Sequence, residues 1–200
     1  MKVAILTFEG YNELDSFVAL GLLNRLKPSG WEVRLCCPQA EVTSMNGVTL
    51  HAQAPLEYAN SADVVLFGSG IFTRDIARSP DILGRLQLDP ARQLIGAQCS
   101  GTLLLAKLQL IPSLTGCTDT TTRPWVEEAG IAVLEKPLHI DGNVATAGGC
   151  LASQYLAAWV MLRTAGLEAA TQALHYVAPV GEKQQYTQRV LDVVMKEAGL

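Results

Sequence analysis

The fold is predicted by the stretch Leu94-Ile95-Gly96-Ala97-Gln98-Cys99-Ser100-Gly101-Thr102-Leu103-Leu104-Leu105-Ala106, in which a short apolar strand runs into one cysteine and then directly into an apolar helix. Small residues, Ala97 and Gly101, stand two positions before and two after the cysteine. A bulky side chain at either flank of so tight a turn would collide with the strand or with the start of the helix. The pattern therefore predicts a nucleophile elbow built around sulfur.

Two interpretations of Cys99 follow from this segment. At a helix start, unpaired backbone N–H groups and the helix dipole favour an anion, which would lower the pKa of the thiol and make Cys99 a reactive thiolate. Alternatively, Cys99 is a buried small hydrophobic residue, as most free cysteines are.

Length and composition favour a well-packed globular protein. The chain has 200 residues, 49% of them hydrophobic and 17% charged, with a net charge of −4. We expect a single domain over residues 1–200, with a small molecule or a protein as partner, because the chain has no basic stripe for nucleic acid or anionic lipid. Five cysteines without a CxxC spacing argue against a disulfide framework or a metal site, and no cofactor is predicted.

The N-terminal segment MKVAILTF is too short for a signal peptide and is typical of a buried first strand. No apolar run reaches the length of a membrane-spanning helix, so we expect a cytoplasmic protein that does not contact a membrane.

Short apolar runs alternate with amphipathic ones along the chain, which predicts a mostly parallel sheet with helices on both faces. Strands are expected at residues 2–8, 32–37, 63–67, 94–98, 131–134 and 144–147, a small hairpin at 43–52, a turn at 141–143, and helices from about 12 or 13 to before 28, and at 80–88, 126–129, 151–162, 168–177 and 183–196. Cys150, just before one of the helices, is expected to pack in the core.

Three expected strands end at Phe8, Phe67 and Gln98. If these strands are neighbours, the loops that follow them converge at one edge of the sheet, where ligands of such folds bind. The loops carry an acidic residue (Asp15), a glycine turn (residues 68–70) and the elbow. A carboxyl group, backbone N–H donors and a thiol would together make a site for covalent catalysis. Alternatively, the helix dipole alone favours Asp15 in a first turn, and residues 68–70 are an ordinary strand-to-helix turn.

The order and spacing of these pieces resemble the DJ-1/PfpI superfamily over nearly the whole chain. The matching pieces are Leu14-Asp15, Gly68-Ser69-Gly70, Ala97-Gln98-Cys99-Ser100-Gly101, Thr121-Thr122-Arg123-Pro124 and the run from Asn143 to Gly149. The resemblance implies an α/β, flavodoxin-like three-layer sandwich of the class I glutamine amidotransferase type, commonly a homodimer. It also implies that Cys99 is the nucleophile, that Asp15 is its carboxylic partner, and that the N–H groups of Gly70 and Ser100 form the oxyanion site.

Differences between branches of the family narrow the expected chemistry. The protease-like branch has a histidine directly after the cysteine, where this chain has Ser100; glyoxalase-like members have a histidine in the segment where this chain has Arg123. The remaining histidines, His51, His139 and His175, are expected to be surface or core residues. An aspartate, a cysteine and a following hydroxyl residue resemble isonitrile hydratases, with serine here in place of threonine.

The resemblance thus implies a cysteine-dependent hydratase or lyase, or a hydrolase, acting on a small molecule. Cys99, Asp15 and Ser100 are the predicted catalytic residues, and Ser69, Gly70, Gly101 and Arg123 the predicted oxyanion or substrate-binding residues. In the predicted isonitrile reaction the Cys99 thiolate attacks the terminal carbon, a protonated Asp15 delivers the proton, and Asp15 or Ser100 positions the water that releases a formamide.

Three alternatives stay open. An amidase or a glyoxalase-type hydratase of the same family would use the same cysteine. Arg123 would favour a substrate carboxylate if it points into the pocket, and is otherwise a surface cation. The fold also serves as the sensor half of AraC-type regulators; no DNA-reading helices are expected after Leu200, so the remaining non-enzyme interpretation is a small-molecule or redox sensor, in which Cys99 oxidises but turns nothing over.

Overall fold

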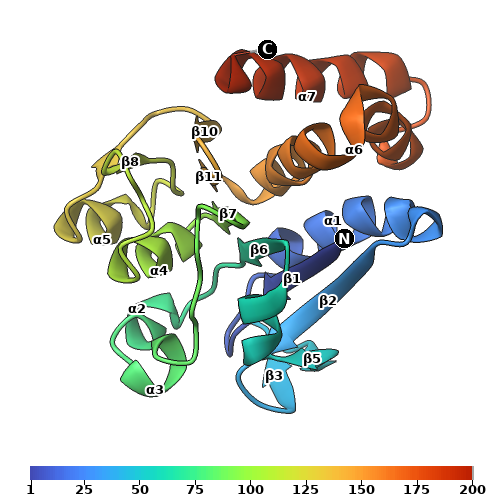
Figure 1. Cartoon of the computed structure of the whole chain (residues 1–200). Helices are drawn as coiled ribbons and strands as arrows, with labels where there is room; N and C mark the ends of the chain where they lie inside the picture. The colour runs from blue at the N-terminus through green and yellow to red at the C-terminus, as the bar shows by residue number, and fades with distance from the viewer. Residues whose placement is uncertain (200) are drawn as a thin grey trace.

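A seven-stranded sheet forms the centre of the computed structural model, which describes residues 1–199 (Figure 1). Its strand order is β10-β11-β7-β6-β1-β2-β5, and every neighbouring pair is parallel except β10 with β11. The strands are β1 (Lys2–Leu6), β2 (Glu32–Cys37), β5 (Ala54–Pro55), β6 (Val64–Phe67), β7 (Leu94–Gln98), β10 (Leu138–Asp141) and β11 (Val144–Ala147).

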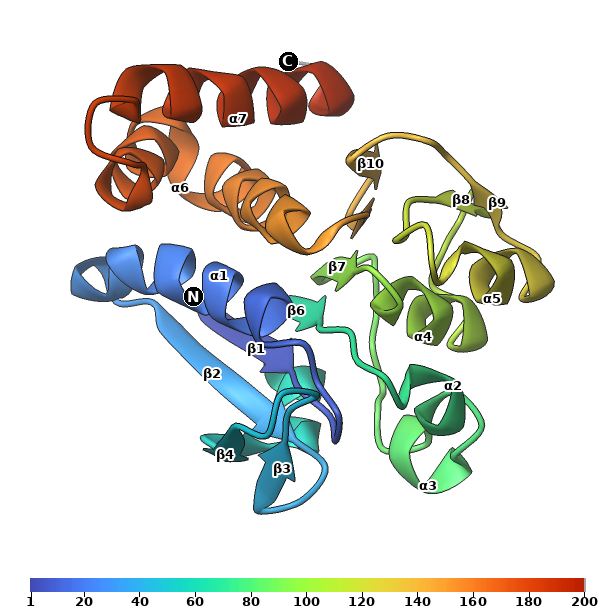
Figure 2. The ribbon, with the colours of Figure 1, turned by 180° about the vertical axis from the view of Figure 1, so that it is seen from behind.

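Helices cover both faces of this sheet, which confirms the predicted three-layer sandwich (Figures 1 and 2). Along β1, Val3 and Ile5 pack into one core while Ala4 and Leu6 pack into the other, because successive side chains of a strand point to opposite faces. The first core is closed by α1 (Glu13–Leu23), α6 (Ser153–Val177) and α7 (Lys183–Ala198), with the 3-10 turn η1 (Asn24–Ser29). The second is closed by α2 (Thr73–Ile76), α3 (Pro80–Leu83), α4 (Gly101–Lys107), α5 (Arg123–Glu128) and the turn η2 (Leu56–Ser61).

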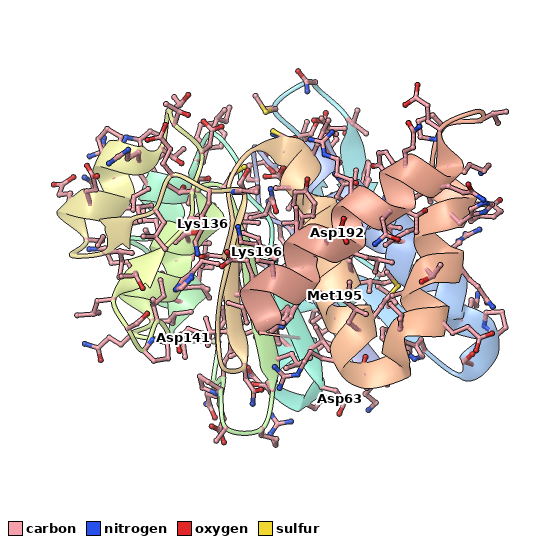
Figure 3. All side chains as sticks on the ribbon, turned by 90° about the horizontal axis from the view of Figure 1, so that it is seen from above. Asp63, Lys136, Asp141, Asp192, Met195 and Lys196 are labelled. Carbon is pink, nitrogen blue, oxygen red and sulfur yellow. The ribbon has the colours of Figure 1, made fainter. Side chains whose placement is uncertain are left out.

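The last two helices lie across one another on the outer side of the sheet (Figure 3). The sequence predicts a break between residues 162 and 168, and the structure confirms it: α6 consists of two helical stretches that meet at Gly166, where φ is 86° and ψ is 174°. A short turn, η3 (Cys150–Ala152), leads into it. An ion pair of 2.6 Å between Lys136 and Glu197 ties α7 to the segment before β10.

Several smaller elements differ from the sequence prediction. The predicted turn at residues 141–143 joins two antiparallel strands, so Leu138–Asp141 is a strand as well. The predicted strand at 131–134 is β9 (Ala132–Val133), which pairs outside the main sheet with β8 (Thr115–Gly116). The predicted hairpin is confirmed as β3 (Glu41–Thr43) and β4 (Thr49–His51). The helix expected at 80–88 ends at Leu83, and α2 was not predicted.

Within residues 1–199, the helices are all too short or too polar to cross a membrane.

Candidate active site

The cysteine lies on a strained turn between β7 and α4. Its φ is 47°, a left-handed value that a residue with a side chain seldom adopts. A methyl group at Gly101 would lie 2.7 Å from the carbonyl oxygen of Gly68 and 2.9 Å from that of Phe67. The turn can therefore pass this close to the end of β6 only with glycine at position 101, which confirms the steric basis of the predicted elbow.

The three loops named in the sequence analysis meet at one edge of the sheet. Strands β1, β6 and β7 are adjacent and parallel, so their carboxyl ends lie side by side (Figure 2). Asp15 stands in the first turn of α1, which is capped by Asn12. The carboxylate oxygen of Asp15 and the sulfur atoms of Cys99 and Cys150 all lie within 4.8 Å of one another.

Asp15 is buried, with 3% of its surface exposed. One carboxylate oxygen accepts a short hydrogen bond from the hydroxyl of Ser69, the other has no hydrogen-bond partner, and Ser153 donates to the backbone carbonyl at 2.8 Å. Burial raises the pKa of Asp15 from 3.8 to about 6, while the hydrogen bond from Ser69 acts in the opposite direction. Ser69 therefore positions the carboxyl group and favours its ionised form.

Cys99 is also buried, with 4% of its surface exposed. Burial raises the pKa of its thiol above the ordinary value of 9.0, and the nearby Asp15 carboxylate raises it further. A hydrogen bond of 3.6 Å from the side-chain amide of Gln98 opposes these effects but is weaker. The expected lowering of the Cys99 pKa is therefore wrong: a helix of seven residues does not offset the loss of water around the sulfur.

The directions of these two shifts favour the negative charge of the cluster on Asp15. Because the pKa of Asp15 is about 6 and that of Cys99 is raised, Asp15 ionises first as the pH increases. Near neutral pH the cluster thus holds a carboxylate beside a thiol. This is the reverse of the predicted protonated Asp15 beside a thiolate, and it suits Asp15 to accept the proton of Cys99.

Ser100 and Gly70 contact each other across the elbow. The amide of Gly70 donates to the hydroxyl of Ser100 at 3.3 Å and to that of Thr73 at 3.2 Å, and the two hydroxyls are 2.8 Å apart. The predicted oxyanion donor at Gly70 is thus already bonded to side chains of the protein. The predicted roles of Ser100 and Gly70 in binding substrate stay predictions.

Cys150 was not anticipated as part of the site. It was expected in the core, but it is only half-buried and its sulfur accepts a hydrogen bond of 3.1 Å from the side-chain amide of Asn12. Its place follows from the parallel pairing of β11 with β7, in which Ala147 lies opposite Gln98. A sequence signal did exist, because Gly148 and Gly149 follow the end of a strand, as the glycines after β6 do.

Arg123 lies at the start of α5, where its side chain is half-exposed and pairs with Glu127 at 2.8 Å. It lines a hollow of about 380 Å³ together with Asp119, Gly148 and Gly149. The histidines lie on other elements: His51 pairs with Glu41 on the hairpin, and His139 contacts Thr115. Arg123 is thus a surface cation near the Gly149 turn, and its role toward a substrate carboxylate stays a prediction.

The cluster also offers ligands for a metal ion. Asp15, Cys99 and Cys150 each provide one ligand atom, and carboxylate with two thiolates is a donor set that zinc accepts. Thiols bind a metal as thiolates, and burial raises the pKa of both cysteines, so binding would become stronger as the pH rises.

Comparison with known proteins agrees with the fold. Schizosaccharomyces pombe DJ-1 superposes with a TM-score of 0.75 at 16% identity, covering 90% of this chain and 100% of that one. Drosophila melanogaster DJ-1beta gives 0.76 at 19% identity, covering 88% and 96%. A ThiJ/PfpI family protein from Pseudomonas syringae gives 0.73 at 19% identity, covering 98% and 89%.

Among curated proteins, no sequence matches this chain. A family model does match, over residues 1–163, a range that contains the elbow, Asp15 and Cys150 and ends within α6. With the elbow cysteine, the sheet order and the structural neighbours in agreement, the chain belongs to the DJ-1/PfpI family.

Proposed function

We propose that the protein is a cysteine-dependent enzyme that adds water to a small molecule, with an isonitrile as the substrate class. The observation that carries this proposal is the burial of Asp15 beside Cys99 on the strained elbow. A carboxylate with a pKa of about 6 can take and return a proton near neutral pH, which a cysteine addition requires at each step.

The reaction begins when the sulfur of Cys99 attacks the terminal carbon of the isonitrile. As the S–C bond forms, the thiol proton passes to the Asp15 carboxylate, and Asp15 then returns it to the attacked carbon, which gives a thioimidate. Water adds to the same carbon: one of its protons ends on the nitrogen, and the other returns to sulfur when the C–S bond breaks. The products are an N-substituted formamide and the free Cys99 thiol.

The residues around the pair support this chemistry better than peptide hydrolysis. Ser100 stands directly after the nucleophile, where the protease-like branch has a histidine, so Asp15 must serve as both acid and base. Ser69 holds the Asp15 carboxyl group in place, and Thr118 donates at 2.7 Å to the carbonyl of Cys99, which fixes the elbow. For Gly70 to bind a developing anion, the substrate would have to replace the hydroxyls of Ser100 and Thr73 as acceptors.

The test is turnover of a small alkyl isonitrile, measured as formamide released. We expect Cys99→Ala to abolish turnover and Asp15→Asn to reduce kcat by about 100-fold or more, because the amide cannot carry a proton. Cys117→Ala, which removes a buried thiol elsewhere, is the matched control and should retain the rate. Normal turnover by Cys99→Ala would exclude the mechanism.

A redox or ligand sensor is the second candidate. The burial and raised pKa of Cys99 favour the ligand sensor, because both make the thiol less reactive. In the same assay, a sensor would release no formamide and would convert neither an amide nor a small 2-oxoaldehyde. Conversion of one of the latter two in place of the isonitrile would identify an amidase or a glyoxalase-type hydratase.

We also propose that the protein is a cytoplasmic homodimer. Its cysteines are all free, as suits a reducing compartment. Exposed apolar side chains, Leu14, Ile71, Phe72 and Leu151, stand on the segments that carry the site, and a second copy would cover apolar surface of this kind. Sedimentation equilibrium distinguishes the dimer from a monomer, and Ile71→Asp should shift the equilibrium toward monomer.

A further inference from the structure

Cys99 and Cys150 are two free thiols that reach the same point from different loops. Cys99 follows β7, and Cys150 follows the glycine turn after β11, the parallel neighbour of β7. Their sulfur atoms lie within 4.8 Å of each other and of the Asp15 carboxylate. The parallel pairing of the two strands brings both loops, and with them the two thiols, to the same edge of the sheet.

The surroundings of Cys150 differ from those of a core cysteine. Its sulfur accepts a hydrogen bond from Asn12, and it is half-buried where Cys99 is nearly inaccessible. Cys150 also lines a hollow of about 460 Å³ with Gly149 and Tyr186, so small solutes can approach this residue from outside the Asp15–Cys99 pair. The isonitrile mechanism leaves this second thiol without a role.

We propose that Cys150 is a resolving thiol, which traps oxidised Cys99 as a reversible intrachain disulfide when the protein meets a hydroperoxide. In the first step the sulfur of Cys99 attacks the peroxide oxygen, the O–O bond breaks, and the thiol proton passes through Asp15 to the departing oxygen. With hydrogen peroxide the products are Cys99 sulfenic acid and water. In the second step Cys150 attacks the sulfenic sulfur and a second water leaves.

The geometry allows this closure with little movement. A disulfide needs the two sulfurs, which lie within 4.8 Å of each other, to approach to about 2.05 Å. On closure Cys150 would give up its hydrogen bond to Asn12. Gly149 has a φ of 89° and no heavy atom near the position a Cβ would take, so the turn beside Cys150 has room to adjust. The closed disulfide would block the nucleophile and protect it from irreversible oxidation until a thiol reductant opens it.

The other cysteines have no such arrangement. The side chains of Cys36, Cys37 and Cys117 are fully enclosed, with at most 1% of their surface exposed, so a peroxide does not reach them. Cys36 and Cys37 are adjacent on β2, where side chains of successive residues point to opposite faces of the sheet. Oxidation should therefore be confined to the Cys99–Cys150 pair.

The test treats the reduced protein with hydrogen peroxide in the presence of a chelator, alkylates the remaining thiols, and maps the peptides by mass spectrometry. In the wild type we expect the peptides of Cys99 and Cys150 to be joined, lighter by two hydrogens, and released by dithiothreitol. In Cys150→Ser, and equally in Cys150→Ala, the joined peptide should be lost and Cys99 should gain two oxygens as sulfinic acid. Cys117→Ser is the matched control and should retain the link.

Circular dichroism of each variant verifies that it is folded. The proposal is overturned if wild type and Cys150→Ser form Cys99 sulfinic acid at the same rate, or if Cys99 stays unmodified in the wild type. The readout is a mass and does not involve turnover. It is therefore independent of the proposed hydratase activity, which is assayed on the reduced protein.

Discussion

Replacing Asp15 by asparagine should stabilise the protein near neutral pH while it removes the proposed acid–base group. The pKa of Asp15 is raised by burial from 3.8 to about 6. A raised pKa means that the folded state binds the proton more tightly than the unfolded chain does, so ionising Asp15 opposes folding. The penalty is absent well below pH 4, grows between about pH 4 and pH 6, and is fully present above pH 6.

A shift of about two pKa units corresponds to roughly 3 kcal/mol at pH 7 and to about half of that at pH 5. Asparagine cannot ionise, so the variant lacks this penalty. The asparagine side chain can keep the hydrogen bond with Ser69. Its NH₂ group, however, takes the place of the carboxylate oxygen that has no hydrogen-bond partner. Burying this unpaired donor costs about 1–3 kcal/mol. That cost does not depend on pH, whereas the penalty of ionisation does.

The measurement is therefore the difference in free energy of unfolding between Asp15→Asn and wild type, obtained from urea titrations at several pH values from 4.5 to 8. We expect this difference to shift in favour of the variant by roughly 2 kcal/mol across the range. Asp81→Asn, an exposed residue in the first turn of α3, controls for the loss of one negative charge. A difference that stays constant with pH would refute the raised pKa of Asp15.

Three further predictions concern the elbow and the Asp15 carboxyl group beside it. Gly101→Ala should destabilise the protein by about 1–3 kcal/mol because its methyl group would meet two backbone carbonyl oxygens, whereas Gly21→Ala, in open space on α1, should be neutral or slightly stabilising in the same thermal unfolding assay. Ser69→Ala removes a hydrogen bond that lowers the pKa of Asp15, so the pH dependence of unfolding should move to higher pH. Alkylation of Cys99 by iodoacetamide should be slow at pH 7 and rise continuously to above pH 9; a plateau below pH 8 would indicate a thiolate instead.

The sequence was informative where the signal is local. Continuous apolar runs predicted β1, β6 and β7. Gly101 predicted the elbow because the tight turn has no room for a side chain at that position. Asp15 was found at the helix start because the asparagine cap before it marks the first turn. Because parallel strands end at the same edge of a sheet, the predicted topology also indicated that the loops after these three strands meet.

Features that depend on long-range packing were missed. Cys150 joins the site through the pairing of β11 with β7. The glycines before Cys150 mark a strand end, but they do not indicate which strand lies beside it. The predicted direction of the Cys99 pKa shift was wrong. The direction is determined mainly by how deeply the thiol is buried, and a helix-start pattern in the sequence does not indicate burial.

The raised pKa values of Asp15 and Cys99 determine when the thiol proton is transferred in the proposed reaction. A free thiolate at Cys99 would be disfavoured by burial and by the Asp15 carboxylate, so the proton should leave sulfur only as an electrophile accepts its electron pair. The carboxylate, with a pKa of about 6, is strong enough to take that proton in a shared transition state and weak enough to give it back. Burial that destabilises the fold at Asp15 would thus also keep Cys99 unreactive until a substrate, or a peroxide, arrives.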